Sequence, residues 1–484
     1  MLSDASRLTP FAAIGVAVAT VLAIGPALGL AALAVACAAW LVLTRPIVMV
    51  AAFAAIVCAN VADVATDVHD LPPLGGLLVP ALAGALALRA ASGAEDISGS
   101  LRLLPPVLLY LLVHAVALLW VRDRAATLVD LVDLAKNLLI VLVLAGYLTT
   151  MERVRTVVWA MAFAIAAIAA LSVFQYATGT FDNAYLGFAN ASMKQIAGET
   201  DSWRASGPLP DPNYFGQVLV LGLPLALAVA LLDRRAAVRT LGAAAGVAIL
   251  AAIFLTFSRG ALLGVAVMIG AGVMTLRSRW LLLSGALLAG AIALALAPGA
   301  YLDRLAPIWQ AASALANGGQ FFADPALGQR VAVVTAAIEM FRDNPAFGIG
   351  FGQFPVQFAD VALRGGLDLG APAEAHSMFL EKLAETGAVG FGLLIGMILF
   401  CVVTALRARR RLAEAGLREE GVLVGAMILS FVGYLSTAVF LHGDYERFLW
   451  LGAALLLSTG AASHLSLTAS APVSARAPGH VIRS

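Results

Sequence analysis

The stretch NYFGQVLVLGLPLALAVALL (residues 213–232) is an apolar run that contains no charged side chain. A helix of roughly 20 such residues is long enough to cross the hydrocarbon core of a bilayer. Similar runs, bounded by charged residues, recur along the chain and predict about fourteen transmembrane helices. The predicted spans lie near 11–26, 28–44, 46–61, 75–91, 103–121, 126–148, 156–178, 213–232, 240–257, 261–276, 280–298, 377–405, 421–441 and 447–466. The first two could instead form one long tilted helix, since only Gly25-Pro26 separates them.

The composition also indicates a membrane protein. Hydrophobic residues make up 61% of the 484 residues, charged residues 12%, and the mean hydropathy is +0.94. A soluble chain of this length needs far more charge to cover its surface. The formal net charge of +1 argues against a nucleic-acid partner, and the three cysteines lie in apolar runs, which excludes a disulfide framework. We therefore predict an all-α polytopic membrane protein whose first apolar run is retained and not cleaved as a signal peptide.

The arginines predict the orientation of the spans. Arg45, Arg89, Arg153, Arg234 and the cluster at 407–418 fall on one side of the predicted bundle, whereas Arg122 and Arg124 are exceptions. The positive-inside rule then places both termini in the cytoplasm and the two long loops outside. The predicted divisions are N-terminal helices (1–178), helices with outer arginine-bearing loops (179–298), a large periplasmic loop (299–376), C-terminal helices (377–466) and a disordered cytoplasmic tail (467–484).

The outer polar segments are where we expect the chemistry, because irregular backbone in a membrane protein is tolerated where it is shielded or wet. In the first loop, Trp203-Arg204-Ala205-Ser206-Gly207-Pro208 leads to Asp211-Pro212-Asn213, and Ser258-Arg259-Gly260 forms a tight turn between two spans. The large loop carries Arg304 and Arg330. Its end is marked by His376, which precedes a helix bearing Glu381 and Glu385.

An amphipathic helix is predicted to begin at Gln329-Arg330 and to stop at Asp343-Asn344-Pro345. Its apolar residues at helical spacing are Val331, Val334, Ile338 and Phe341.

Each of these side chains has an ordinary structural explanation. Arg204 could be a solvated loop arginine, and Arg330 could lie on the polar face of a surface helix. His376 could cap a helix or pair with Glu381. Arg259 could reach to lipid headgroups, but it lies on the side that the charge rule disfavours, which favours a functional role.

Charged residues inside or beside spans also have ordinary structural explanations. Lys136 lies within a span, about one and two turns from Asp133 and Asp130, and an intramembrane charge pair is a candidate site. We nevertheless expect structural pairing there. We also expect Asp444, Glu446 and Arg447 to form a structural ion pair at an outer helix end.

The arginines and the histidine, taken as a set, fit an anionic substrate. Guanidinium groups match phosphate oxygens in a bidentate way, and histidine can remove a proton from a hydroxyl near neutral pH. No acidic cluster suits a divalent cation, so arginine would neutralise a pyrophosphate leaving group without a metal. The expected substrate is a lipid-linked pyrophosphate, and no cofactor is expected.

The order of these motifs resembles the O-antigen ligase and repeat-unit polymerase superfamily over about residues 200 to 395. The matching residues are Arg204, Gly207, Pro212 and Asn213, then Ser258 to Ala261, Arg330 before Asn344 to Gly350, and His376 with Gly387 and Gly390. Two departures stand out. Ser377 replaces an asparagine common in relatives, and Val333-Val334 replaces a tryptophan.

The resemblance implies a metal-independent inner-membrane glycosyltransferase with a GT-C-like helical bundle, membrane lipids around it and a site facing the periplasm. The donor would be a glycan on undecaprenyl pyrophosphate, and the acceptor a glycan or a lipid. Arg204 and Arg330 would bind the pyrophosphate, His376 would activate the acceptor hydroxyl, and Arg259 would support the site. We add Asn213, Glu381 and Arg304 as candidate substrate-binding residues.

The sequence leaves two alternatives open. Transfer to lipid A core, to a second lipid-linked repeat or to a protein side chain would each fit these residues. A transporter or flippase of a lipid-linked sugar is the rival from another class, and it should carry ionisable groups at mid-membrane on several helices.

Overall fold

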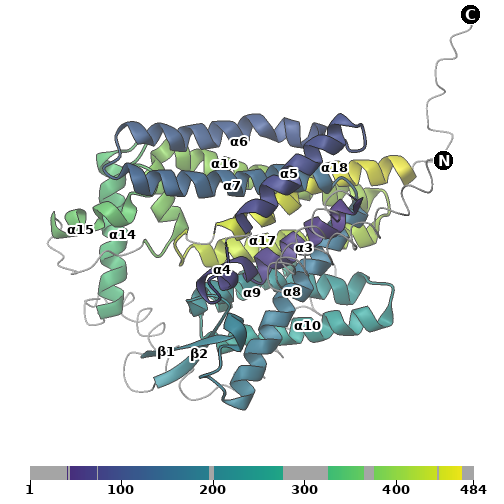
Figure 1. The fold of residues 1–484 in the computed structure, drawn as a ribbon, viewed down its shortest axis with the longest axis horizontal. Coiled ribbons are helices and arrows are strands. Elements are labelled where there is room, and N and C mark those ends of the chain that lie inside the picture. The colour runs from purple at the N-terminus through teal and green to yellow at the C-terminus, as the bar shows by residue number, and fades with distance from the viewer. Residues whose placement is uncertain are drawn as a thin grey trace, which may run out of the picture.

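The computed structural model describes residues 41, 44–72, 75–195, 201–275, 325–364, 375–443 and 446–470. These residues form a bundle of long helices with a small hairpin at one end (Figure 1). The helices are α3 (Pro46–Cys58), α4 (Val61–Asp67), α5 (Gly75–Ala91), α6 (Ser98–Val116), η1 (Ala117–Leu119), α7 (Arg124–Tyr147), α8 (Met151–Thr178), η2 (Tyr185–Gly187), α9 (Pro212–Leu232), α10 (Ala236–Leu255), α11 (Arg259–Thr275), α14 (Pro325–Asp343), α15 (Phe354–Arg364), α16 (Met378–Glu414), α17 (Arg418–Ala438) and α18 (Arg447–Ser470).

The helices confirm the prediction of a multi-pass membrane protein. Within the described residues, seven helices are long and apolar enough to cross a membrane, or eight if α3 and α4, bent by 59°, count as one span. Every predicted span on described residues contains a helix. The spans predicted near 11–26 and 280–298, and 28–44 apart from Leu41 and Thr44, lie outside the described residues, so the count of fourteen stays a prediction.

The loop predicted at 179–212 contains a two-stranded sheet, which the all-α prediction did not include, in a structure that is otherwise helical among the described residues. Strand β1 (Asn190–Gln195) pairs antiparallel with β2 (Asp201–Gly207), with Arg204 opposite Ser192. Strand β2 packs against α8 and α9, and the ring of Trp203 stacks on Phe181 at 4.8 Å. A hairpin alone is marginally stable, so this packing is what holds the strands.

Helix α9 lies at the centre of the bundle and is the most buried of the candidate spans. It packs against α8, α10, α11 and α17. Its first residues, at the end that faces the hairpin, are therefore fixed relative to all four neighbours.

Helix α16 is broken at Gly387, whose φ of 61° and ψ of −166° are accessible almost only to glycine. The segment after α14, residues 345–350, pairs with the backbone on both sides of the break. Four hydrogen bonds join them: Ile349 N–H to Ala384 O (3.0 Å), Gly350 N–H to Glu385 O (2.9 Å), Ala388 N–H to Pro345 O (2.8 Å) and Val389 N–H to Ala346 O (3.1 Å). A Cβ on Gly348 would collide with the backbone of Glu385, so both glycines permit this close approach.

The buried face of α14 differs from the predicted apolar stripe. Val334 and Ile338 are 39% and 37% exposed, whereas Val333, Ala336 and Met340 are buried. The small side chain of Ala336 lets α14 pack closely against the neighbouring helices. The helix begins at Pro325, earlier than predicted. Its buried face joins an apolar cluster with Phe354, Phe358, Ala375 and Ala384.

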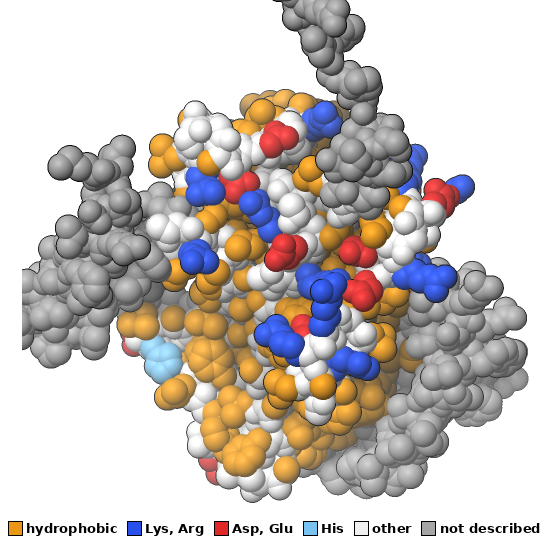
Figure 2. Space-filling model, turned by 90° about the vertical axis from the view of Figure 1, so that its right-hand side faces the viewer, with side chains coloured by type: hydrophobic (Ala, Val, Ile, Leu, Met, Phe, Trp, Pro, Cys, Tyr) orange, Lys and Arg blue, Asp and Glu red, His pale blue; other side chains and the backbone are white. Residues whose placement is uncertain are grey.

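Lys and Arg side chains gather at one end of the bundle (Figure 2). Figure 2 shows the end opposite the hairpin, where α5 joins α6 and α9 joins α10, with Lys and Arg side chains gathered on it. Glu95 at this end receives both Arg153 (2.8 Å) and Arg89 (3.4 Å). Arg122, an exception to the charge pattern, pairs at the other end with Asp360 at 2.6 Å. Which end faces the cytoplasm stays a prediction.

We predict that Gly387→Ala lowers the free energy of unfolding by about 1–3 kcal/mol or more, because its Cβ strains the backbone and meets the backbone of Ala346. The control is Gly392→Ala in the same helix, where an added Cβ meets nothing within 4 Å. Thermal unfolding in detergent measures both. Equal midpoints for the two variants would contradict the role given to the helix break.

Candidate active site

The turn between α17 and α18 is the point at which the predicted site segments meet; its described residues are 439–443 and Glu446. Leu441 O accepts a hydrogen bond from Met378 N–H (2.6 Å), and His442 O accepts one from the Tyr214 hydroxyl (3.3 Å). Gly443 N–H donates to Glu381 Oε2 (3.0 Å). The turn therefore joins the starts of α9 and α16.

The same turn lies beside the start of α11. A Cβ built on Gly260 would lie 3.7 Å from the Cβ of Phe440. Three segments that are far apart in the sequence, carrying Asn213, Arg259 and His376, are thus assembled around one short turn.

His376 is exposed and has a φ of +47°, in the left-handed region that few non-glycine residues adopt. Its ring lies edge to face with that of His442, centroid to centroid 5.9 Å, and His442 meets the Tyr214 ring at 5.3 Å. The structure gives the capping of α16 to Ser377, whose hydroxyl accepts from Leu380 N–H (3.5 Å). His376 is therefore not the helix cap, and its imidazole is presented at the surface beside a second histidine.

Arg204 is buried, so the interpretation of it as a solvated loop arginine is wrong. Its Nε–H donates to Thr256 O (2.9 Å) and its Nη2 to Asn213 Oδ1 (3.1 Å). The guanidinium thus ties the hairpin to the end of α10 and the start of α9, because both partners lie on other elements. Two of the candidate site residues, Arg204 and Asn213, are therefore in direct contact.

Arg259 belongs to the turn whose backbone Arg204 binds. It is the exposed first residue of α11 and follows Thr256 by three positions. Phe257 has a φ of +50°, and the Ser258 hydroxyl accepts from Ala261 N–H (3.3 Å). In this tight turn Arg204 binds the backbone, and the exposed Arg259 extends from the turn.

The structure describes the backbone of only one of the two candidate arginines in the predicted large loop. Arg330 lies in α14, three residues before the buried Val333, but its side chain is outside the described part. Because Val333 and Ala375 belong to the same apolar cluster, the helix of Arg330 and the segment preceding His376 share one core. Arg304 lies outside the described residues altogether.

A buried ionic cluster surrounds Lys382, which the sequence analysis did not single out. Its Nζ lies 2.8 Å from Glu446, 3.6 Å from Glu385 and 3.7 Å from Glu381, and 4.4 Å above the ring of Phe351. The ammonium holds these carboxylates together by opposing their charge. Among the described residues no group of His, Cys, Asp and Glu is arranged as metal ligands.

The sequence predicts an ion pair among Asp444, Glu446 and Arg447. Asp444 lies outside the described residues, and the other two side chains form ion pairs with residues of distant elements. Glu446 pairs with Lys382, as above. Arg447 crosses to α4, where its Nη1 donates to Asp63 Oδ1 (3.0 Å). The ends of helices that are far apart in the sequence meet here. Adjacent positions in the sequence therefore do not reveal which side chains pair.

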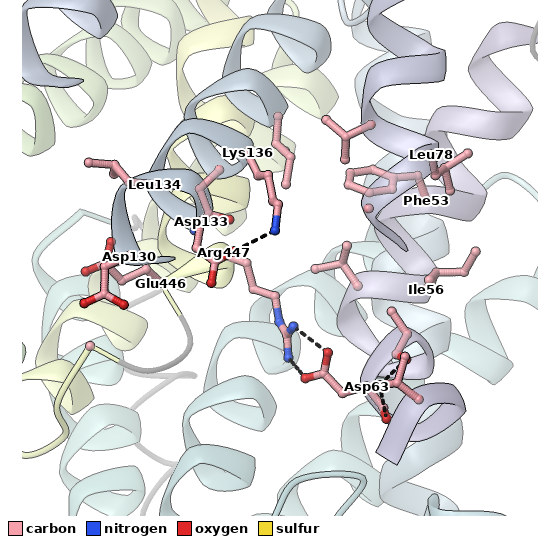
Figure 3. A pocket seen from close by; sticks show the side chains of 18 of the residues that line it. Phe53, Ile56, Asp63, Leu78, Asp130, Asp133, Leu134, Lys136, Glu446 and Arg447 are labelled. Atoms are coloured by element: carbon pink, nitrogen blue, oxygen red, sulfur yellow. Dashed lines mark hydrogen bonds and ion pairs between the residues drawn. The ribbon is translucent and has the colours of Figure 1, made fainter. Parts of the chain in front are cut away.

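A cavity of about 530 Å³ opens beside this cluster (Figure 3). Charged residues of α7, α16 and α18 form one wall, and Phe53, Ile56 and Leu78 of α3 and α5 contribute an apolar wall. Lys136 pairs with Asp133 at 2.8 Å, which confirms the predicted structural pairing. Both side chains line the cavity.

The residues that the sequence analysis missed are Tyr214, His442, Gly443 and Lys382. Two signals could have found them. His442-Gly443 stands in a short turn on the same predicted side as His376, and Lys382 lies between two acidic residues at the start of a span.

The comparison with protein families adds an independent observation. Residues 244–395 match the family model described as O-antigen ligase. The match contains Arg259, Arg304, Arg330, His376 and Glu381, and begins after Arg204 and Asn213. It supports the assignment of the chain to the O-antigen ligase and polymerase superfamily. No curated protein matches the chain.

We predict that Arg204→Lys lowers the free energy of unfolding by about 1–3 kcal/mol, because an ammonium cannot satisfy Thr256 O and Asn213 Oδ1 together. Thermal unfolding of the purified protein measures this. Arg235→Lys, at a side chain 79% exposed, is the control and should leave the midpoint unchanged. An unchanged midpoint for Arg204→Lys would show that the two hydrogen bonds of Arg204 do not stabilise the fold.

Proposed function

We propose that this multi-pass membrane protein of the O-antigen ligase and polymerase superfamily is a glycosyltransferase acting on the periplasmic face of the bacterial inner membrane. It transfers or polymerises glycan from an undecaprenyl-pyrophosphate-linked donor. The observation that carries the proposal is the meeting of the Asn213, Arg259 and His376 segments at the α17–α18 turn, with Arg204 bound to Asn213, in a chain whose residues 244–395 match the O-antigen ligase family.

In the proposed reaction, the acceptor hydroxyl oxygen forms a bond to the anomeric carbon of the donor sugar. The bond from that carbon to the diphosphate oxygen breaks, which inverts the carbon, and the hydroxyl proton passes to His376. The diphosphate on the lipid carrier keeps the bonding electrons. Its charge is stabilised by Arg259 and Arg330, with Arg204 fixed beside them through two of its five N–H donors.

The predicted orientation is supported by the distribution of charge. The arginine-rich turns lie at the end of the bundle away from the hairpin, and cytoplasmic turns carry an excess of Lys and Arg. The candidate site then faces the periplasm, where lipid-linked glycans are expected to be exposed.

The transporter or flippase alternative is favoured by one observation, the ion-paired cavity. Residues of four helices place ionisable groups there, more than the sequence analysis expected of this chain. However, Glu381 is the fourth residue of α16 and Glu446 precedes α18, so these groups lie at helix ends. Among the longer described helices that line the cavity, only α7 contributes ionisable groups near its middle, Asp133 and Lys136. Reconstitution in vesicles separates the two functions, since a flippase moves donor between leaflets without forming a glycosidic bond.

We predict that His376→Ala lowers kcat for glycan transfer about 10²–10⁴-fold, because the acceptor hydroxyl loses its general base. The assay uses purified lipid-linked donor and the full chain in detergent. His464→Ala, an exposed histidine of α18, is the control and should keep full activity. Full activity in a folded His376→Ala variant would remove the proposed base.

We also predict that Arg330→Lys raises the donor KM or lowers kcat by about 10–100-fold, since a charge-assisted pair of hydrogen bonds to phosphate is worth about 1.5–3 kcal/mol. Arg342→Lys is a matched control, because Arg342 is exposed at the other end of the same helix. If both variants transfer glycan equally well, Arg330 does not bind the diphosphate.

A further inference from the structure

The cavity beside Lys382 is linked to His376, the proposed base, through one residue, His442. Gly443 lines the cavity, and its neighbour His442 lies against the ring of His376. A Cβ on Gly443 would lie 3.1 Å from Glu446 Oε1 and 3.4 Å from Glu381 Oε1. The glycine therefore allows both carboxylates to approach the turn, which places them beside a position one residue along the chain from His442, the ring partner of His376.

The charge of the cavity does not suit a diphosphate. Its acidic residues are Asp63, Asp130, Asp133, Glu381 and Glu446. Its basic residues are Lys136, Lys382 and Arg447, which gives a formal net charge of −2. Each basic side chain is already paired with a carboxylate. An anionic ligand would meet repulsion here, whereas carboxylates accept strong hydrogen bonds from hydroxyl groups.

The two walls suit a ligand that is polar at its edge and apolar on its faces. Carboxylates and amines project from α7, α16 and α18, and opposite them lie Phe53, Ile56 and Leu78 (Figure 3). A sugar ring has this character, with hydroxyls around its rim and C–H groups on its faces. The volume of about 530 Å³ lies within the usual range of ligand sites, about 300–1,000 Å³.

We infer that this cavity is the subsite for the hydroxyl-bearing saccharide of the acceptor, and that the diphosphate of the donor binds apart from it on the arginine side. The inference rests on the proposed function, because it uses His376 as the group that the acceptor hydroxyl must reach. Glu381 then contacts the acceptor and not the donor. The Asp133–Lys136 pair, half-exposed to the cavity, supplies both an acceptor and a donor of hydrogen bonds to sugar hydroxyls.

The test fills the cavity without touching the proposed catalytic residues. Gly76 lines it, and an added Cβ there meets nothing within 4 Å, so Gly76→Trp places an indole in open space. Gly84→Trp is the control in the same helix, with equal space around it and no part in the lining. We expect Gly76→Trp to raise the acceptor KM at least tenfold with the donor KM unchanged, and Gly84→Trp to change neither.

A second pair of variants removes charge and not space. Asp133→Asn should raise the acceptor KM about tenfold, while Asp360→Asn should leave it unchanged. The two aspartates are matched, because each is exposed and ion-paired, Asp133 with Lys136 and Asp360 with Arg122, and only the first lines the cavity. Thermal unfolding verifies that the variants are folded.

A binding measurement keeps this inference separate from the proposed function. The probe is a single repeat-unit oligosaccharide hydrolysed from the organism's own surface polysaccharide, titrated calorimetrically into the full chain, with inorganic pyrophosphate as competitor. Binding that is lost in Gly76→Trp, kept in Gly84→Trp and unaffected by pyrophosphate supports the subsite, even if no transfer is detected. Displacement by pyrophosphate, equal binding by both tryptophan variants, or a raised donor KM in Gly76→Trp would overturn it.

Discussion

The site depends on how the protein satisfies the backbone of a helix that is broken inside an apolar bundle. At Gly387 the regular hydrogen bonding of α16 is interrupted, and unpaired N–H and C=O groups there would each cost several kcal/mol in a lipid environment. Residues 345–350 provide the partners through four hydrogen bonds. That pairing fixes α14 against α16, and with it the helix of Arg330 relative to His376. The glycines that the family resemblance emphasises thus act first through backbone geometry.

The α17–α18 turn makes a second connection of the same kind, between the outer ends of spans that are far apart in the sequence. Backbone atoms of Leu441, His442 and Gly443 bond to α16 and to Tyr214 of α9. Because α9 packs against four helices, its first turn is held rigidly. Asn213 in that turn binds Arg204 and so fixes the position of its guanidinium group. Loops that carry function on a rigid scaffold are held in this way by a few specific contacts.

The sequence predicted the helical spans on the described residues because hydrophobic runs of bilayer length are a strong signal. The segments of Asn213, Arg259 and His376 that it named as a candidate site are brought together by the α17–α18 turn, and their catalytic roles stay a prediction. The sequence could not predict the hairpin of β1 and β2, since short strands with mixed polarity are defined by their tertiary packing. It left open whether Arg204 is solvated, because burial depends on Thr256 and Asn213, which contact it from other elements. The partners of Glu446 and Arg447 were missed for the same reason.

Electrostatics explains why the two halves of the proposed site lie apart. A diphosphate needs uncompensated cationic groups, whereas a neutral saccharide is better bound by carboxylates whose charge is partly balanced. If both groups of side chains lined one pocket, the arginines would pair with the carboxylates and neither substrate would be bound well. Here Lys382 partly balances the charge of Glu381, Glu385 and Glu446, and Arg447 is paired with Asp63. Gly443 N–H binds Glu381 of this ionic cluster, and the neighbouring His442 contacts the ring of His376. In the reaction that we propose, His376 therefore stands between the acceptor and the diphosphate of the donor, where it takes the proton of the acceptor hydroxyl.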